Sequence, residues 1–306
     1  MPKSYVFTEH GGPEVETFID RPHPVAGPGQ LVVEVRAAGV NPADWKRRAG
    51  FRPPGVAPVE LPAVLGGEVA GVVAQVGEGV GGFAVGDSVF GNTVTGGYAE
   101  YTVLAAEVTA HKPDRLSFAD AATLPIAAAT AYDGVHQLGL PPGATLLITG
   151  VGGGVGVAAA QIARHVGLTV IGTASAGKKD FVESLGVIHV EPGPDVADRV
   201  QAAAPEGVDA VYDLVGGAAL EEVAGVVADK SKLITAADRT TVARLGGAGV
   251  ERARNRVVLD AVARLAADGV LNPFVTQTFP LEQAARALRT VEDGHARGKV
   301  VIEVTR

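Results

Sequence analysis

The chain has 306 residues, of which 47% are hydrophobic, and its formal net charge is −8. This length accommodates two domains of ordinary size, and no uninterrupted apolar run reaches the roughly 20 residues of a membrane span. The negative charge excludes a general attraction to nucleic acid or anionic lipid, so any positive charge that binds phosphate must be local. The absence of cysteine excludes disulfides, thiol catalysis and cysteine-ligated metal sites. Because the first residues lack the long apolar region of a signal peptide, we expect a cytoplasmic protein.

The first third of the chain predicts β-structure. Residues 4–7 are expected to form a first strand, and alternating apolar and polar residues predict strands over 30–38 and 68–76. Shorter strands are expected over 98–104 and 108–111. Clusters of glycine, proline and aspartate separate these segments, as is typical of turns.

From about residue 117, helical patterns alternate with short apolar strands. The expected helices cover residues 118–137, 155–166, 178–185, 196–204 and 219–226. The expected strands cover residues 145–149, 169–174, 187–190, 208–214 and 232–236. This alternation is typical of βαβ units, so we expect an α/β fold with a doubly wound parallel sheet. Beyond it, the pattern predicts helices over 253–267 and 281–291 and a strand over 299–304, of which the last helix and the strand return to the first domain.

The most informative segment is a glycine-rich turn with the spacing Gly150-x-x-Gly153-x-x-Gly156, placed between an apolar strand and an alanine-rich helix. Glycines let backbone N–H groups approach a phosphate without a Cβ clash, and the new helix presents its positive end. We therefore expect Gly150, Gly152, Gly153, Gly154 and Val155 to hold a dinucleotide pyrophosphate. The spacing differs from the common G-x-G-x-x-G fingerprint. The alternative is a structural turn that binds no ligand.

The residues beyond the next strand predict the choice of cofactor. Folds of this kind that bind NAD usually place an acidic residue about 20 residues past the glycines, where it holds the ribose 2′-hydroxyl. Thr173 and Ser175 stand at that place, and no Asp or Glu occurs between Gly150 and Lys179. Ser175 and Lys179, with Lys178 beside them, would bind a 2′-phosphate instead, which predicts NADP(H). The alternative is that both lysines are solvated residues at the start of a helix.

Nine segments, in this order, resemble the zinc-independent quinone oxidoreductases of the medium-chain dehydrogenase/reductase superfamily. They are GVNPAD (39–44), GGEVAG (66–71), GDSVF (86–90), GYAEY (97–101), LP (124–125), TAY (130–132), the glycine turn, DLVGG (213–217) and GHARGKV (294–300). The resemblance implies a GroES-like substrate domain formed by residues 1–116 and 275–306. It also implies a Rossmann NADP(H)-binding domain formed by residues 117–274, with the cofactor in the cleft between the two.

The resemblance also implies roles for residues of the first domain. The residue that matches Asn41 faces the nicotinamide and the substrate in the family, and Asn41 is therefore a candidate catalytic and cofactor-binding residue. From the sequence alone, Asn41 is equally well the N-cap of a helix that has Pro42 at its first position. Lys46 either donates a hydrogen bond to a substrate carbonyl or is exposed. Lys299 either reaches the cofactor or is a lysine at a strand edge.

In the second domain, the residue that matches Thr130 contacts the nicotinamide side, although a threonine early in a helix can also bond only its own turn. Val215 and Gly216 follow one strand of the parallel sheet, and Ala236 and Ala237 follow the next. Ligand crevices of such sheets form at the carboxyl ends of the strands. All four residues are therefore expected to line the cofactor.

No zinc site is expected. Zinc-dependent members of the superfamily place a cysteine and a histidine where this chain has Asn41 and Gly67, and the seven histidines form no pair with ligand spacing. Without a Lewis acid, the predicted reaction is hydride transfer from NADPH to a quinone or to an activated C=C bond of an enone. The proton would come from water or Lys46. The alternatives are an enoyl-thioester reductase and a non-catalytic, NADPH-binding redox sensor.

The resemblance further implies a homodimer in which the parallel sheets of two subunits join edge to edge. The outermost strand is expected from residues 232–272, and the apolar segment 269–275 supports an interface there. An unpaired strand edge invites uncontrolled pairing, and a two-fold interface would remove that edge. The alternative is a monomer in which this segment packs against its own helices.

Overall fold

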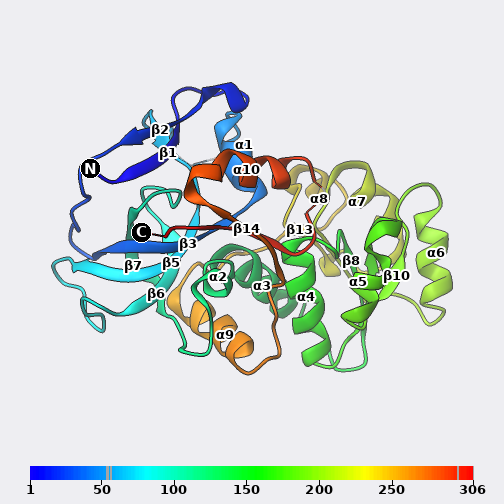
Figure 1. Ribbon diagram of the computed structural model, residues 1–306. Coiled ribbons are helices and arrows are strands. Elements are labelled where there is room, and N and C mark those ends of the chain that lie inside the picture. The colour runs from blue at the N-terminus through cyan, green and yellow to red at the C-terminus, as the bar shows by residue number, and fades with distance from the viewer. Residues whose placement is uncertain (53–54, 56, 295, 306) are drawn as a thin grey trace. The chain divides into compact units, whose positions relative to one another are not determined.

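The computed structural model describes all residues except 53, 54, 56, 295 and 306, so His295 of the last motif lies outside the described residues. The chain forms two compact units, both drawn in Figure 1. The first unit contains Met1–Ile126, Arg254–Ala267 and Val275–Arg306, and the second contains Ala127–Ala253 and Asp268–Phe274. The domain boundaries expected from the sequence stay a prediction, because the compactness of a unit does not by itself define an independently folding domain.

The first unit is built mainly on antiparallel strands, four of which close into a ring. The main sheet has the order β14 (Val275–Pro280), β15 (Lys299–Glu303), β3 (Gln30–Val40), β5 (Glu68–Val76), β6 (Ser88–Thr93) and β7 (Tyr101–His111). Since β7 also pairs with β3, the strands β3, β5, β6 and β7 form a closed ring. A smaller sheet has the order β2 (Glu16–Asp20), β1 (Lys3–Phe7) and β4 (Ala63–Val64).

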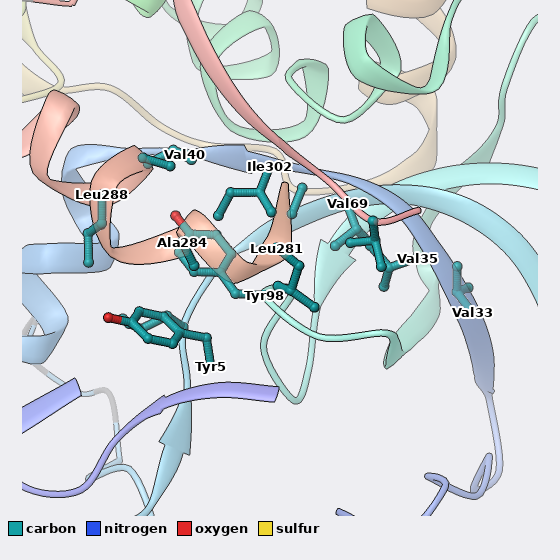
Figure 2. Packing of buried hydrophobic residues seen from close by; sticks show 14 of the residues in the cluster. Tyr5, Val33, Val35, Val40, Val69, Tyr98, Leu281, Ala284, Leu288 and Ile302 are labelled. Carbon is teal, nitrogen blue, oxygen red and sulfur yellow. The ribbon is translucent and has the colours of Figure 1, made fainter. Parts of the chain in front are cut away.

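The core of the first unit lies between these strands and the last helix. Alternate residues of β3, among them Leu31, Val33 and Val35, are buried against it. Figure 2 shows Tyr98 together with Ala284 and Leu288 of α10 (Ala284–Glu292), and the same cluster includes residues of β15. The last helix and the last strand therefore belong to the first unit.

The second unit contains a sheet in which every neighbouring pair of strands is parallel. Its order is β10 (Ile188–Val190), β9 (Thr169–Thr173), β8 (Thr145–Thr149), β11 (Ala210–Asp213), β12 (Leu233–Thr235) and β13 (Ala248–Gly249). Its helices are α3 (Ala129–Leu138), α4 (Gly154–His165), α5 (Lys179–Ser184), α6 (Val196–Ala203), α7 (Gly217–Val223) and α8 (Arg239–Arg244). The predicted α/β class, with a Rossmann-type parallel sheet in one unit and a β-rich, GroES-like other unit, is thereby confirmed.

Helices of the first unit are α1 (Pro42–Arg48), α2 (Phe118–Ala121), α9 (Arg256–Ala267) and α10. The segments expected as one helix over 118–137 and as two strands between 98 and 111 differ in the structure. Pro125 lies in a π-helical turn, Leu124–Ala128, that separates α2 from α3, because proline lacks the N–H that a continuous helix needs. The two expected strands are one, β7. None of the helices that the described residues form is long and apolar enough to cross a membrane.

Candidate functional site

The first group of candidate residues surrounds Asn41, at the point where β3 ends and α1 begins. Strand β15 pairs with β3 so that Val300 lies opposite Val40, which brings the neighbouring Lys299 next to Asn41. Strand β5 pairs with the other edge of β3 and begins at Glu68. Three strands that are far apart in the sequence thus deliver an amide, an ammonium and a carboxylate to one place.

These three side chains are bonded to one another. The Asn41 amide nitrogen donates to Glu68 Oε1 at 2.7 Å, and Lys299 Nζ donates to Asn41 Oδ1 at 2.6 Å and to Glu68 Oε1 at 3.0 Å. Lys299 Nζ also lies 3.3 Å from its third acceptor, the Val40 carbonyl oxygen. Glu68 is 0% exposed, and Asn41 and Lys299 are each 4% exposed. A buried charge needs hydrogen bonds or a partner of opposite charge, and Lys299 has both, so it lies in a buried cluster and not at an exposed strand edge.

Asp44 and Tyr98 extend this cluster. The carboxylate of Asp44 accepts hydrogen bonds from the Asn41 backbone N–H and from the Tyr98 hydroxyl, both at 2.8 Å. Burial raises the pKa of Asp44 to about 6, against the opposing effect of these two hydrogen bonds. Burial also raises the pKa of Tyr98, and the neighbouring Asp44 adds to that shift. Sequence reasoning missed both residues, although the spacing of Asn41 and Asp44 is that of an N-cap and its N3 partner.

Lys46 lies outside this cluster. It is an exposed residue of α1, and its ammonium lies 5.7 Å from the centroid of the Trp45 ring. The same helix is anchored at its other end by Arg48, which is 2% exposed and forms ion pairs with Glu16 and Glu292. Helix α1 is therefore fixed at both ends, and the structure does not bring Lys46 to Asn41.

The second group of candidate residues forms the glycine turn between β8 and α4. Gly150 has φ +65°, a conformation that favours glycine. Gly153 is the N-cap of α4, so the N–H groups of Gly154 and Val155 have no acceptor within the helix. A Cβ built at Gly153 would meet a single group within 4 Å, the Gly150 carbonyl oxygen at 3.5 Å. The turn therefore leaves an open, N–H-lined cradle that a phosphate fits.

Gly156 has a different role in the same turn. A Cβ at this position would lie 2.6 Å from Val151 Cα and 2.7 Å from the Gly150 carbonyl oxygen. Both are backbone atoms that cannot move aside, so Gly156 lets α4 approach the turn closely. The packing reading of the glycines thus applies to Gly156, whereas Gly153 borders open space.

A buried carboxylate joins the ends of the neighbouring strands. Asp213, at the end of β11, is 0% exposed and accepts from the Thr149 hydroxyl at 2.7 Å and from the Thr235 hydroxyl at 2.6 Å. It also accepts from the backbone N–H groups of Val215 and Gly216. Asp213 therefore ties together β8, β11 and β12 at their carboxyl ends.

The loops that were expected to line the cofactor are held by this arrangement. Val215 is 53% exposed, and a Cβ at Gly150 would lie 2.9 Å from Val215 Cγ2, so the loop after β11 adjoins the glycine turn. Ala236 and Ala237 are exposed after β12, and the Ala237 N–H donates to the Thr235 hydroxyl at 3.0 Å. The structure thus brings Gly150, Val215, Gly216, Ala236 and Ala237 to one edge of the sheet.

The residues expected at a 2′-phosphate follow β9. Thr173 is buried and its hydroxyl accepts from the Gly150 N–H at 3.2 Å, which links β9 to the turn. Ser175 is exposed just beyond. Lys179 is exposed, 4.0 Å from Glu183 on its own helix, whereas a Cβ at Gly152 would lie 2.7 Å from Lys178 Cδ. Of the two lysines, Lys178 is therefore the one whose side chain lies against the glycine turn.

Thr130 is the second residue of α3 and is 5% exposed. Its carbonyl oxygen accepts a hydrogen bond from the Tyr212 hydroxyl at 2.8 Å, which links α3 to β11. Burial raises the pKa of Tyr212. Thr130 therefore occupies a well-fixed position within the second unit.

The described residues do not supply the ligands of a zinc ion. Among them, no three His, Cys, Asp or Glu side chains gather at distances suited to a metal. Asn41 and Gly67 stand where the resemblance would require a cysteine and a histidine. At these two positions the chain therefore lacks the side chains that a catalytic zinc site of this kind uses.

The segment expected at a subunit interface packs against its own chain. Leu271 is 2% exposed, the Gln161 side chain bonds the Asn272 backbone N–H at 2.9 Å and its carbonyl at 2.8 Å, and the Phe274 and Phe181 rings meet edge to face. The apolar character of residues 269–275 is thus accounted for without a second subunit. The edge strand β13, by contrast, lies within the range expected for the outermost strand.

The chain is similar to proteins of known family. Residues 27–114 match the model of the alcohol dehydrogenase GroES-like domain, and residues 185–302 match the model of the zinc-binding dehydrogenases. The human quinone oxidoreductase is 32% identical over 96% of this chain and 95% of its own length. The NADPH-dependent alkenal/one oxidoreductase of Arabidopsis thaliana is 32% identical over 98% of this chain and 79% of its own length.

The fold has close counterparts as well. The quinone oxidoreductase of Coxiella burnetii matches with a TM-score of 0.89 at 29% identity, and 99% of each chain is covered. Some relatives are far longer: the chain spans 8% of the pikromycin polyketide synthase component PikAII of Streptomyces venezuelae, at 36% identity over 94% of this chain.

Proposed function

We propose that this chain, which belongs to the zinc-independent quinone oxidoreductase family of the medium-chain dehydrogenase/reductase superfamily, is an NADPH-dependent reductase of enones or quinones. Membership in the family makes it an oxidoreductase. The name of the Arabidopsis relative supports NADPH and an enone, and that of the human relative supports a quinone.

The observation that carries the proposal is the cradle at the start of α4. Its open position at Gly153 and the N–H groups of Gly154 and Val155 suit a pyrophosphate at the positive end of a helix. The loop after β11 adjoins this turn, and the loop after β12 adjoins Gly216 of the loop after β11, as a dinucleotide site at the carboxyl ends of parallel strands requires.

The residues after β9 support NADPH over NADH. Between Gly150 and Lys179 the sequence has no Asp or Glu that could accept a hydrogen bond from a ribose 2′-hydroxyl or repel a 2′-phosphate. Ser175 and the two lysines supply a donor and positive charge, and Lys178 lies against the turn. We therefore add Lys178 to the predicted 2′-phosphate ligands Ser175 and Lys179.

The residues of the chain determine the rest of the chemistry. A bound nicotinamide supplies the hydride. Because Asn41 and Gly67 stand where a zinc-dependent relative would have a cysteine and a histidine, we propose that hydrogen-bond donors polarise a carbonyl group conjugated to the accepting C=C bond. We propose Asn41 as such a donor, with Thr130 beside the cofactor. Water and Lys46 stay the two predicted proton sources, and the exposed position of Lys46 favours water.

A screen of NADPH oxidation against quinones, enones and enoyl thioesters tests the function. We expect turnover with an enone or a quinone and little with the thioesters. Turnover confined to enoyl thioesters would support the alternative reductase. NADPH binding without turnover on any acceptor would instead support a redox sensor.

The 2′-phosphate ligands have a separate test in binding measurements. Lys178→Ala should weaken NADPH binding about tenfold, a loss of about 1.4 kcal/mol, and leave NADH binding unchanged. Lys179→Ala is the matched control on the same segment, with a smaller expected effect because of its pairing with Glu183.

A homodimer and a cytoplasmic location stay predictions. Light scattering decides the first, because a mass near 31.0 kDa would refute the dimer.

A further inference from the structure

The Asn41 amide is held between two opposite charges. Lys299 Nζ lies 2.6 Å from its oxygen, and Glu68 Oε1 lies 2.7 Å from its nitrogen. An ammonium can only donate and an ionised carboxylate can only accept. A flipped amide would set its N–H groups against the ammonium and its oxygen against the carboxylate. The charges of Lys299 and Glu68 therefore impose one orientation on the amide.

Both charged groups are engaged by partners within the cluster. Lys299 has three acceptors, of which Val40 O is the longest at 3.3 Å. Glu68 uses Oε1 for Asn41 and Lys299, and its other oxygen accepts from the Ile126 N–H at 2.7 Å. The Asn41 nitrogen, in contrast, carries two N–H groups, and Glu68 accepts one of them. The second N–H is the donor that this arrangement leaves available to a ligand.

A stability role alone does not explain such a pair. Replacing a buried ion pair by apolar residues of similar size is often neutral or stabilising, whereas removing one partner is strongly destabilising. Apolar residues would serve equally well at these positions if only packing were required. What apolar residues cannot do is fix the polarity of an amide.

We propose that Glu68 and Lys299 are positioning residues that fix Asn41 as a hydrogen-bond donor, whose second N–H binds the carbonyl oxygen of a ligand. This inference rests on the proposed function. Two carbonyl groups have the required chemistry: the carboxamide of the nicotinamide and the conjugated carbonyl of the substrate. The first would affect NADPH binding, and the second would affect turnover of the enone.

The test removes the ion pair without leaving a single buried charge. The variant Glu68→Gln/Lys299→Met should fold, because neither remaining side chain is charged. We expect its kcat for an enone to fall about 10- to 100-fold. The Asn41 amide would be held less firmly, and a misplaced binding group can slow a reaction by about that factor. Unchanged NADPH affinity would assign the N–H to the substrate carbonyl, and a parallel loss of affinity would assign it to the carboxamide. Glu221→Gln/Arg244→Met, which removes an exposed pair, is the control and should retain full activity.

A second measurement separates positioning from a general structural effect. If the pair acts through Asn41, Asn41→Ala should lower kcat strongly in the native chain but little further in the double variant. The same fold loss in both backgrounds would overturn the proposal. So would a double variant that keeps both full kcat and full NADPH affinity.

A readout that needs no activity completes the test. The chain contains four asparagines, Asn41, Asn92, Asn255 and Asn272, so ¹⁵N-asparagine labelling gives a simple side-chain amide spectrum. In the native protein the Asn41 amide protons should exchange slowly with water, and in the double variant they should shift and exchange faster. An unchanged Asn41 signal would overturn the proposal. The amide spectrum still tests the positioning role if none of the quinones, enones or thioesters supports NADPH oxidation. That result would refute the proposed function and leave the positioning of Asn41 to be decided by the spectrum.

Discussion

Two buried carboxylates in this chain are stabilised in different ways. Glu68 in the first unit is paired with the ammonium of Lys299 and with the Asn41 amide. Asp213 in the second unit is surrounded by neutral donors, the hydroxyls of Thr149 and Thr235 and two backbone N–H groups. Both are 0% exposed. The difference shows that burial of a carboxylate does not require a cation, so the presence of Lys299 beside Glu68 has its own reason.

The neutral donors around Asp213 hold loops. Each donor belongs to a different strand end or to the loop that follows, and one carboxylate can therefore fix the edge of a parallel sheet. The charged pair around Asn41 fixes a single side chain instead. The first therefore fixes the loops of the proposed cofactor site, and the second fixes the orientation of one amide.

The largest expected effect comes from breaking the charged pair. Lys299→Met leaves Glu68 buried without its cation and should lower the free energy of unfolding by about 3–5 kcal/mol. Urea denaturation measures this loss. Glu68→Gln/Lys299→Met should recover most of the stability, and a single variant as stable as the native chain would contradict the role of this ion pair.

The next largest effect is expected in the pH dependence of stability. Burial raises the pKa of Asp44 from 3.8 to about 6 in the folded protein. The folded state therefore holds this proton more tightly than the unfolded state, so the contribution of Asp44 to stability is complete below pH about 4 and is lost as the pH rises through about 6. The full change should be about 3 kcal/mol. Its charged and titratable neighbours are Glu68, Lys299 and Tyr98.

Asp44→Asn removes this titration and keeps an oxygen for the Asn41 N–H and the Tyr98 hydroxyl. Urea denaturation between pH 4 and 6, compared with the native chain, should show a flatter pH dependence. An identical dependence in both proteins would show that Asp44 does not titrate in this range.

Replacing Asp213 should lower the stability of the protein less than replacing Lys299. Asp213→Asn keeps one acceptor and turns an NH₂ group toward one of the existing donors, which should lower stability by about 1–3 kcal/mol. Thermal unfolding measures the loss, and NADPH affinity should fall with it because the loops after β11 and β12 lose their anchor. A loss as large as that of Lys299→Met would remove the distinction between the two carboxylates.

Two glycines of the turn should separate binding from packing. Gly153→Val fits the open space at that position and should change stability little, but it should abolish NADPH binding by filling the cradle. Gly156→Ala forces a Cβ against the backbone of Val151 and should lower stability by about 1–3 kcal/mol. Thermal unfolding and NADPH titration of both variants check this. Unchanged NADPH binding in Gly153→Val would mean that the turn serves packing alone.

Local patterns in the sequence predict the elements of the second unit well. The alternation of apolar strands and helices gives the parallel sheet, and the glycine turn gives the position of the cradle. The break in the helix expected over 118–137 was missed, although Pro125 is a direct signal for it. The single long strand β7 was missed because residues 105–107 interrupt the apolar pattern.

The partners of Asn41 could not be predicted in this way. Glu68 and Lys299 lie 27 and 258 residues from it in the chain, and the registers of β5 and β15 against β3 bring them together. Similarly, Asp213 meets Thr235 because the two residues are partners in the pairing of β11 with β12. Such contacts depend on strand register, which is fixed by the packing of the whole sheet.

The most direct test of the account is to titrate the native protein with NADPH and with NADH under the same conditions. The quenching of protein fluorescence reports the binding. The account predicts that NADPH binds at least about tenfold more tightly, a difference of about 1.4 kcal/mol or more, because Ser175 and the two lysines replace the acidic ribose ligand. Equal affinities for the two cofactors, or no binding of either, would contradict it.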